Sequence, residues 1–189
     1  MPLLLPKDLP RYECLLEAAR EFPDLDPSAT EVFLHLLRAG DEAFRLSEED
    51  LARHDITQGR FGVMMVLWGN CRREGGRSVP LSPAELAERT GVTRATITGL
   101  IDTLERSGLV MRTPNSTDRR MTSVALTVRG EKLLRKIFPG HFRRMAWLMA
   151  PLDEAERKTL VALLSKVLGR AAERPTAPSA ELAIPSAAG

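Results

Sequence analysis

Residues 81–110 read LSPAELAERTGVTRATITGLIDTLERSGLV, and this stretch decides the fold. Ser82 precedes a proline at the first helical position and a glutamate at the third, which is the pattern of a capping box. Gly91 ends this short helix, and Thr93 can cap a second helix that runs to about Ser107. Two helices joined by a tight turn are typical of a helix-turn-helix.

The second helix is predicted to have two unlike sides. Ile97, Ile101 and Leu104 recur at helical spacing and favour burial. Threonine is a mediocre helix former, so its repetition on the other side suggests that these hydroxyls make contacts. The polar side carries Arg94, Thr96, Thr98, Thr103 and Arg106.

A β-hairpin is expected after this helix. Residues 109–112 and 122–126 alternate as strands do, and the loop PNSTDRR at 114–120 separates them. Its tip carries Arg119 and Arg120. A helix-turn-helix followed by a hairpin with a basic tip predicts a winged helix-turn-helix. In that arrangement the second helix enters the major groove of DNA and the hairpin approaches the minor groove.

Five further helices are predicted around this motif. Ser28, with Glu31 three positions on, is expected to cap the second of them, and Pro139-Gly140 to kink or break the fourth. The fold class is therefore mainly α with a small β-hairpin wing. Residues 173–189, rich in alanine and proline, are expected to form a flexible tail. The helices cover residues 8–22, 28–54, 57–73, 127–148 and 153–172.

Length and composition favour a cytoplasmic protein that consists of one domain, or of one domain with additional segments. The chain has 189 residues, of which 43% are hydrophobic, and its longest strongly apolar run, 63–68, is far too short to span a membrane. The two cysteines, Cys14 and Cys71, fit no zinc-site spacing and suggest a reducing compartment. No catalytic set of nucleophile, base and acid stands out, so we do not expect an enzyme.

The net charge of +2 hides an asymmetry along the chain. Residues 1–88 carry 10 basic and 16 acidic residues, whereas residues 89–144 carry 12 basic and 4 acidic residues. A basic middle segment suggests a surface that faces a polyanion, although an ordinary solvated basic face remains the alternative.

The motifs together resemble the MarR-type transcriptional regulators. The resemblance rests on LSPAELA at 81–87, VTRATIT at 92–98, LERSGLV at 104–110, DRR at 118–120 and LTVRG at 126–130. It covers about residues 28–172. It implies a homodimeric, sequence-specific regulator of double-stranded DNA with a pseudo-palindromic site, most simply a repressor released by a small aromatic or phenolic ligand.

The same resemblance implies a division of the chain into functional regions. The winged helix-turn-helix domain would cover 57–138, and the helical dimerisation domain 28–56 and 139–172. Residues 1–27 would form an N-terminal extension with a short helix.

The resemblance also implies roles for single residues. Arg94, Thr96 and Thr98 would face bases or phosphates, and the helix start at Thr93 would direct N–H groups toward a phosphate. Gly99 stands where many members carry an arginine, which puts one base contact in doubt. In the wing, Arg120 would reach the minor groove, Asp118 would brace the loop through an ion pair, and Arg112 and Arg119 would contact the DNA backbone.

Three alternatives concern regulation and function. An effector site could involve His35 beside Arg38, together with Met64 and Trp68 in a cleft of the kind that binds aromatic acids in this family. Cys14 could act as a redox switch, or could simply be a small buried residue on an apolar helix face. The chain could also be a dimeric interaction protein of the same fold that does not read DNA. No metal site or cofactor is expected.

Overall fold

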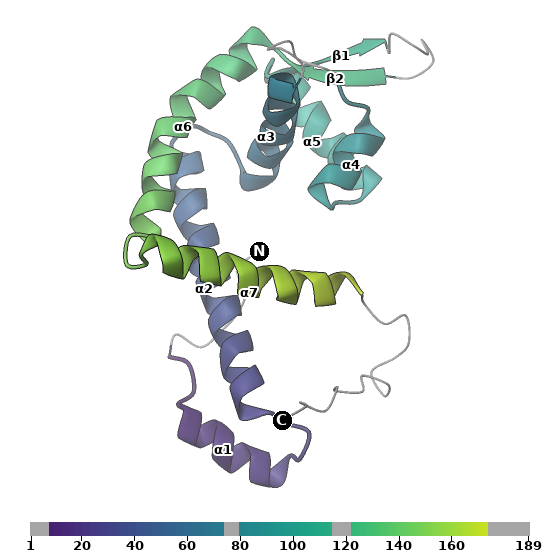
Figure 1. The fold of residues 1–189 in the computed structure, drawn as a ribbon. Helices are drawn as coiled ribbons and strands as arrows, with labels where there is room; N and C mark the ends of the chain where they lie inside the picture. Colours follow the sequence, from purple (N-terminus) through teal and green to yellow (C-terminus); the bar gives the residue numbers. More distant parts are fainter. Residues whose placement is uncertain (1–7, 74–79, 115–121, 174–189) are drawn as a thin grey trace. The chain divides into compact units, whose positions relative to one another are not determined.

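The computed structural model describes residues 8–73, 80–114 and 122–173. Within these ranges the chain is mostly helical with one antiparallel pair of strands, so the predicted fold class is confirmed (Figure 1). The chain divides into two compact units, residues 1–145 and 146–189. The elements are α1 (Tyr12–Glu21), α2 (Pro27–Ala52), α3 (Gln58–Arg73), α4 (Pro83–Thr90), α5 (Arg94–Arg106), β1 (Val110–Pro114), β2 (Thr122–Leu126), α6 (Val128–Leu148) and α7 (Glu154–Ala172).

Helices α3, α4 and α5 pack against one another and against the hairpin (Figure 1). Helices α4 and α5 each turn an apolar side into a shared core, as amphipathic helices require. The middle of α3 is apolar nearly all round and packs into the same core. A bridge between Leu81 and Val124 adds one residue pair beside the hairpin, with N–H···O distances of 3.0 and 2.7 Å. The fully buried side chains include Val63, Met64 and Leu67 of α3, Leu86 of α4, and Ile97, Ile101 and Leu104 of α5.

Helix α6 starts against the base of the hairpin. The Thr127 hydroxyl donates to the carbonyl oxygen of Gly108 (2.7 Å) and accepts from the N–H of Gly130 (3.1 Å), so it caps α6 and ties it to the end of α5. Leu134 and Ile137, further along α6, are fully buried in the core. The start of α6 is therefore fixed to the winged motif at several points.

Several boundaries differ from the sequence-based expectation, among them the start of α1, which lies at Tyr12 rather than at residue 8. Ser28 is not the cap of α2: Asp26 is, and its Oδ1 accepts from the N–H groups of Ser28 (2.9 Å) and Ala29 (3.0 Å). Proline suits the first helical position, so Pro27 begins the helix and the aspartate before it takes the cap. The N–H of Ala29, then the hydroxyl of Ser28, lowers the pKa of Asp26.

Strand β1 extends to Pro114, and α6 is unbroken through Pro139.

The terminal helices differ in how much they bury. Helix α1 packs against α2 and buries Leu15. Helix α7 begins with the predicted capping box of Asp153 and Glu156, yet none of its residues is buried. Among the residues with described structure, no helix is both long and apolar enough to cross a membrane.

Candidate nucleic-acid interface

A complete capping box fixes the start of α4. Ser82 Oγ accepts from the N–H of Glu85 (3.2 Å), while a Glu85 carboxylate oxygen accepts from the N–H of Ser82 (2.8 Å) and from its hydroxyl (2.7 Å). These bonds, the hydroxyl first, hold the pKa of Glu85 below its ordinary value. Gly91, with a φ of 68°, ends α4 in the left-handed conformation that glycine adopts without strain. The predicted helix-turn-helix start is confirmed.

Helix α5 presents a buried side and an exposed side. Thr93 caps it as predicted, with its hydroxyl accepting from the N–H of Thr96 at 3.2 Å. Apart from Arg94, the exposed side chains of its N-terminal half are short, so the backbone itself can come close to a ligand. A helix N-terminus also attracts phosphate, because its first N–H groups lack partners. Exposed residues of α5 are Arg94, Ala95, Thr96, Thr98, Gly99, Asp102 and Arg106.

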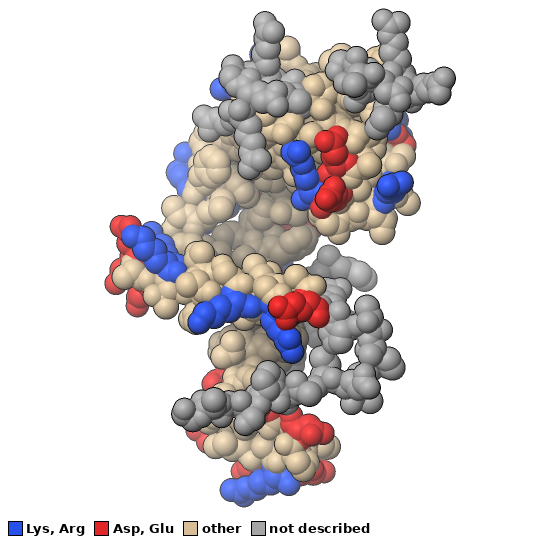
Figure 2. All heavy atoms as spheres, turned by 45° about the vertical axis from the view of Figure 1, so that its right-hand side comes forward, with Lys and Arg blue, Asp and Glu red and all other residues tan. Residues whose placement is uncertain are grey.

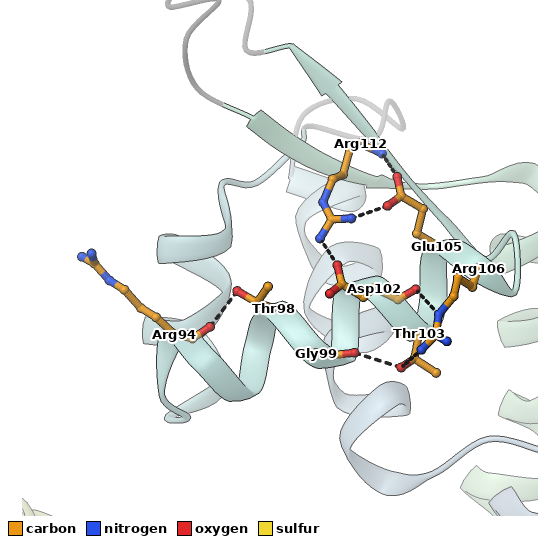
Figure 3. A network of polar contacts seen from close by, with 8 residues as sticks. All are labelled: Arg94, Thr98, Gly99, Asp102, Thr103, Glu105, Arg106 and Arg112. Atoms are coloured by element: carbon orange, nitrogen blue, oxygen red, sulfur yellow. Dashed lines mark hydrogen bonds and ion pairs between the residues drawn. The ribbon is translucent and has the colours of Figure 1, made fainter.

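The side chains along α5 differ in how they are held. The Thr98 hydroxyl donates to the carbonyl oxygen of Arg94 (2.8 Å), which keeps it against the helix. The Arg94 side chain points away from the other residues drawn (Figure 3). Near the C-terminal end, Thr103 donates to the carbonyl oxygen of Gly99 (2.9 Å), and Arg106 donates to the carbonyl of Asp102 and to the Thr103 hydroxyl (3.3 Å each) (Figure 3). Arg94 is thus extended, whereas Arg106 lies along its own helix.

A shallow hollow of about 300 Å³ joins α5 to its neighbours. It brings Arg94 and Thr98 together with residues that the sequence reasoning did not single out as site residues. Thr122 could have been found from the sequence, since it opens the second strand after the wing loop. The newly found lining residues are Ser82, Pro83, Ala84 and Thr122.

Arg112 connects β1 to α5 by two ion pairs. Its Nη2 lies 2.5 Å from a carboxylate oxygen of Asp102, and its Nη1 donates to the Glu105 carboxylate (Figure 3). The backbone N–H of Arg112 also donates to Glu105, at 3.2 Å. These carboxylates, Asp102 first, raise the pKa of Arg112. The predicted contact of Arg112 with DNA stays a prediction, and the structure gives this side chain two partners within the protein.

The wing is described only in its strands. Strands β1 and β2 pair in antiparallel register from Val110 opposite Leu126 to Pro114 opposite Thr122. The wing tip lies outside the described residues. It includes Arg119 and Arg120, for which DNA contacts were expected, and Asp118, which was expected to brace the loop through an ion pair. Their roles therefore remain predictions.

Charge on the winged motif is mixed. In the face shown in Figure 2, acidic side chains lie beside basic ones over its helices. The ion pairs of Arg112 with Asp102 and Glu105 are one source of this mixing. Residues 89–144 keep their basic excess, since these two carboxylates are already counted in it.

The four residues considered for an effector site lie in different surroundings. The His35 ring lies 2.8 Å from the carbonyl oxygen of Glu31, and Arg38 pairs with Glu42 at 2.5 Å. Met64 is fully buried in the core. Trp68 packs edge-on against Phe138 and beneath the Arg135 guanidinium, 4.9 Å from the ring centre. Their role in ligand binding stays a prediction.

Cys14 has a free, exposed thiol on α1, so the alternative in which it is a small buried residue on an apolar helix face is wrong. The buried position of α1 is the next residue, Leu15. The side chain of Cys71 lies outside the described residues. Within the described ranges, no group of three or more His, Cys, Asp or Glu residues could hold a metal ion.

Comparison with known proteins points to one family. The sequence model that defines the MarR family matches residues 76–122, which span α4, α5 and β1. The HTH-type transcriptional repressor YetL of Bacillus subtilis is 33% identical over 164 residues, which cover 87% of this chain and 95% of that protein.

Solved structures share the fold. The chain resembles Staphylococcus aureus MepR in its complex with DNA, with a TM-score of 0.64, 22% identity, and coverage of 73% of this chain and 94% of that one. It also resembles Bordetella bronchiseptica BpsR, whose DNA binding is regulated by 6-hydroxynicotinic acid. That TM-score is 0.59, with 27% identity and coverage of 70% and 90%.

Proposed function

The chain belongs to the MarR family of transcriptional regulators, and on this basis we propose that it is a homodimeric, sequence-specific DNA-binding repressor released by a small aromatic or phenolic ligand. Its two copies would bind a pseudo-palindromic site in double-stranded DNA. Their two α5 helices would enter successive major grooves about one helical turn apart.

The observation that carries this proposal is the exposed N-terminal half of α5. Its cap, Thr93, and its extended side chain, Arg94, lie at the end of the helix where unpaired N–H groups can meet phosphate. Thr96 and Thr98 are exposed on the same half and are short enough to let the helix approach base edges. Ile97, Ile101 and Leu104 hold the opposite side in the core.

Exposed apolar side chains on the terminal unit support a homodimer. Helix α7 buries none of its residues within the chain, although five of its aliphatic side chains are exposed. Large apolar surfaces of this kind are usually covered by a partner. A second copy would cover them by pairing residues 28–56 and 139–172. The exposed aliphatic residues of α7 are Leu160, Val161, Leu163, Val167 and Leu168.

The ligand-responsive part of the proposal draws on a relative. DNA binding by BpsR is regulated by 6-hydroxynicotinic acid, a small aromatic acid. A ligand can release DNA from this chain only if it binds the geometry without DNA more tightly than the bound geometry. His35, Arg38, Met64 and Trp68 are the residues that we propose for effector contacts from the sequence.

The exposed thiol of Cys14 supports a second mode of control. An accessible cysteine can be oxidised, and oxidation on α1 could alter how this helix packs on α2. In this alternative, peroxide rather than an organic ligand releases the DNA. Cys14→Ser should then abolish peroxide-dependent release, and an unchanged response in this variant would rule the alternative out.

The proposal is tested by fluorescence anisotropy on DNA from beside the protein's own coding region, with scrambled DNA as control and a series of salt concentrations. We expect selective, salt-dependent binding with two chains per site. Arg94→Ala and Arg120→Ala should each weaken binding by about 1–3 kcal/mol if they contact DNA. Lys132→Ala removes an exposed positive charge from α6 and serves as the matched control.

Absence of binding even at low salt would contradict the proposal and favour a dimeric interaction protein of the same fold. Equal affinity of Arg94→Ala and the unaltered protein would argue against α5 as the reading helix. Failure of aromatic acids to release the DNA would remove only the ligand part of the proposal.

A further inference from the structure

The middle of α5 exposes few side-chain hydrogen-bond donors. Its exposed residues are Thr98, Gly99 and Asp102. Gly99 has no side chain, and a Cβ added there would meet nothing within 4 Å, so this position is open. Asp102 offers acceptor oxygens, one of which pairs with Arg112 at 2.5 Å. What the middle of the helix can offer a partner therefore depends on how the Thr98 side chain is held.

The hydroxyl hydrogen of Thr98 is already used within the protein. Oγ1 of Thr98 donates to the carbonyl oxygen of Arg94 at 2.8 Å, one turn back on the same helix. A hydroxyl has a single hydrogen, so Thr98 keeps its lone pairs and its methyl group for a partner. In Figure 3 the Oγ1 atom of Thr98 points toward that carbonyl group and the methyl group points away from it.

The donors of α5 lie instead toward its two ends. In the first turn, the Arg94 side chain is extended (Figure 3). The hydroxyls of Thr93 and Thr96 share one hydrogen bond of 2.9 Å, which leaves one of their two hydrogens for a ligand. The second guanidinium of the helix belongs to Arg106, in its last turn. Between these ends, α5 exposes a methyl group and acceptor oxygens.

The Thr98 side chain also borders open space. It lines the hollow of about 300 Å³ together with Pro83 and Ala84, whose side chains are apolar. Its neighbour Ile97 is fully buried and holds this part of α5 against the core. The methyl group of Thr98 is therefore held in position and remains accessible to a base edge.

The bases of DNA differ in what they present in the major groove. Guanine presents two acceptors, N7 and O6, which require donors. Thymine presents a methyl group, and its partner adenine presents an amino donor. A side chain with a methyl group and lone pairs, but no spare hydroxyl hydrogen, matches an A·T pair and leaves both guanine acceptors unsatisfied.

We propose that Thr98 sets a preference for thymine at the base pair facing the middle of α5, through contact of its methyl group with the 5-methyl group of thymine. The inference rests on the proposed function, since it requires α5 to lie in the major groove. The first turn then supplies donors, with Arg94, and the middle supplies apolar contact. The hydroxyl of Thr98 orients the side chain and makes no hydrogen bond to a base.

The test begins with the full chain and a library of DNA duplexes that carry a randomised segment. Sequences enriched by binding define the preferred half-site. Each thymine of this half-site is then replaced in turn by uracil, which lacks only the 5-methyl group. Fluorescence anisotropy should find one replacement that weakens binding about fourfold for each half-site, which is the effect of one buried methyl group.

Variants of Thr98 assign that methyl contact to the residue. Thr98→Ser keeps the hydroxyl and removes the methyl group, so it should bind the thymine site about fourfold more weakly for each half-site and lose the penalty for uracil. Thr98→Val keeps the methyl group in the rotamer that valine prefers in helices, so it should retain both the affinity and the penalty. Thr159→Ser is the matched control, because Thr159 makes the same bond on α7, to the carbonyl of Ala155 at 3.0 Å.

The outcomes separate this inference from the proposed function. Weaker binding by Thr98→Val, or half-sites in which no uracil replacement matters, would show that the methyl group does not read the base and would overturn the inference alone. An equal uracil penalty in Thr98→Ser would assign the methyl contact to another residue, with the same consequence. Failure to enrich any sequence would contradict the proposed function itself, and the inference with it.

Discussion

The guanidinium of Arg144 lies 2.5 Å from the carboxylate of Asp50, although 94 positions separate them in the sequence. The Asp50 side chain is only 5% exposed and that of Arg144 25% exposed. The second oxygen of Asp50 is buried without a hydrogen bond from the described residues. This carboxylate therefore depends on Arg144, and the pair joins the end of α2 to α6 just beyond Pro139.

Arg144→Ala should destabilise the fold by about 3 kcal/mol, the lower end of the range for a broken buried ion pair, because Arg144 keeps some contact with water. Urea unfolding at a fixed protein concentration measures the change. Arg143→Ala removes the exposed neighbouring arginine and should stay within about 0.5 kcal/mol of the unaltered protein. Similar losses in both variants would show that the pair does not stabilise α6 on α2.

Gly130 is expected to tolerate no side chain. A Cβ at this position would lie 2.2 Å from the carbonyl oxygen of Leu109, which is backbone and cannot swing away. Gly130→Ala should therefore cost about 1–3 kcal/mol through forced backbone shifts. Gly69→Ala is the matched control in α3, because nothing lies within 4 Å of its added methyl group. This control should be neutral or stabilising by up to about 1 kcal/mol. Thermal unfolding of both variants distinguishes a packing effect from a general effect of alanine.

The sequence predicted the features that depend on local chemistry. The caps at Ser82, Thr93 and Asp153 were all confirmed, because a cap needs only a side chain and the N–H groups two or three residues ahead. The cap of α2 was placed at Ser28 instead of Asp26, because Ser28 with Glu31 three positions on also fits the pattern of a capping box. Even this error lay between two candidate cap residues of one helix, Asp26 and Ser28.

Contacts between elements were not predictable in the same way. Asp102 and Glu105 read as ordinary exposed helix residues, and only the return of β1 beside α5 brings Arg112 to them. The exposure of Cys14 also depends on how α1 packs, since Leu15 rather than its neighbour turns toward α2. Such features require the tertiary structure, because residues far apart in sequence determine them.

The capping box of α4 predicts a dependence of stability on pH. The folded-state pKa of Glu85 lies below its ordinary value of 4.5, so the ionised cap stabilises the fold above that value. This contribution is lost as the pH falls through the folded-state pKa. Ser82→Ala should lower the free energy of unfolding by about 1 kcal/mol at pH 7 and by less at pH 3.

Urea unfolding of this variant across that pH range is the measurement. Glu88→Gln removes an exposed carboxylate from the same helix without touching the cap, and it serves as the control. An effect of Ser82→Ala that is equal at both pH values would contradict the role assigned to Glu85.

The two ion pairs of Arg112 allow its positioning role to be separated from a contact with DNA. As a phosphate contact, Arg112 would be replaced fairly well by lysine, which keeps the charge. As a clamp that joins β1 to α5, Arg112 needs its planar guanidinium group to reach Asp102 and Glu105 together.

In the clamp, the carboxylates matter as much as the arginine. Asp102→Asn combined with Glu105→Gln removes two negative charges near DNA, which by electrostatics alone should strengthen binding. If the clamp orients α5 against β1, this double variant and Arg112→Lys should instead both weaken operator binding, by about 1 kcal/mol or more. Fluorescence anisotropy at two salt concentrations measures operator affinity. The dependence of this affinity on salt should stay nearly unchanged in Arg112→Lys. Stronger binding by the double variant would show that the carboxylates merely repel DNA and that the clamp does not position the reading helix.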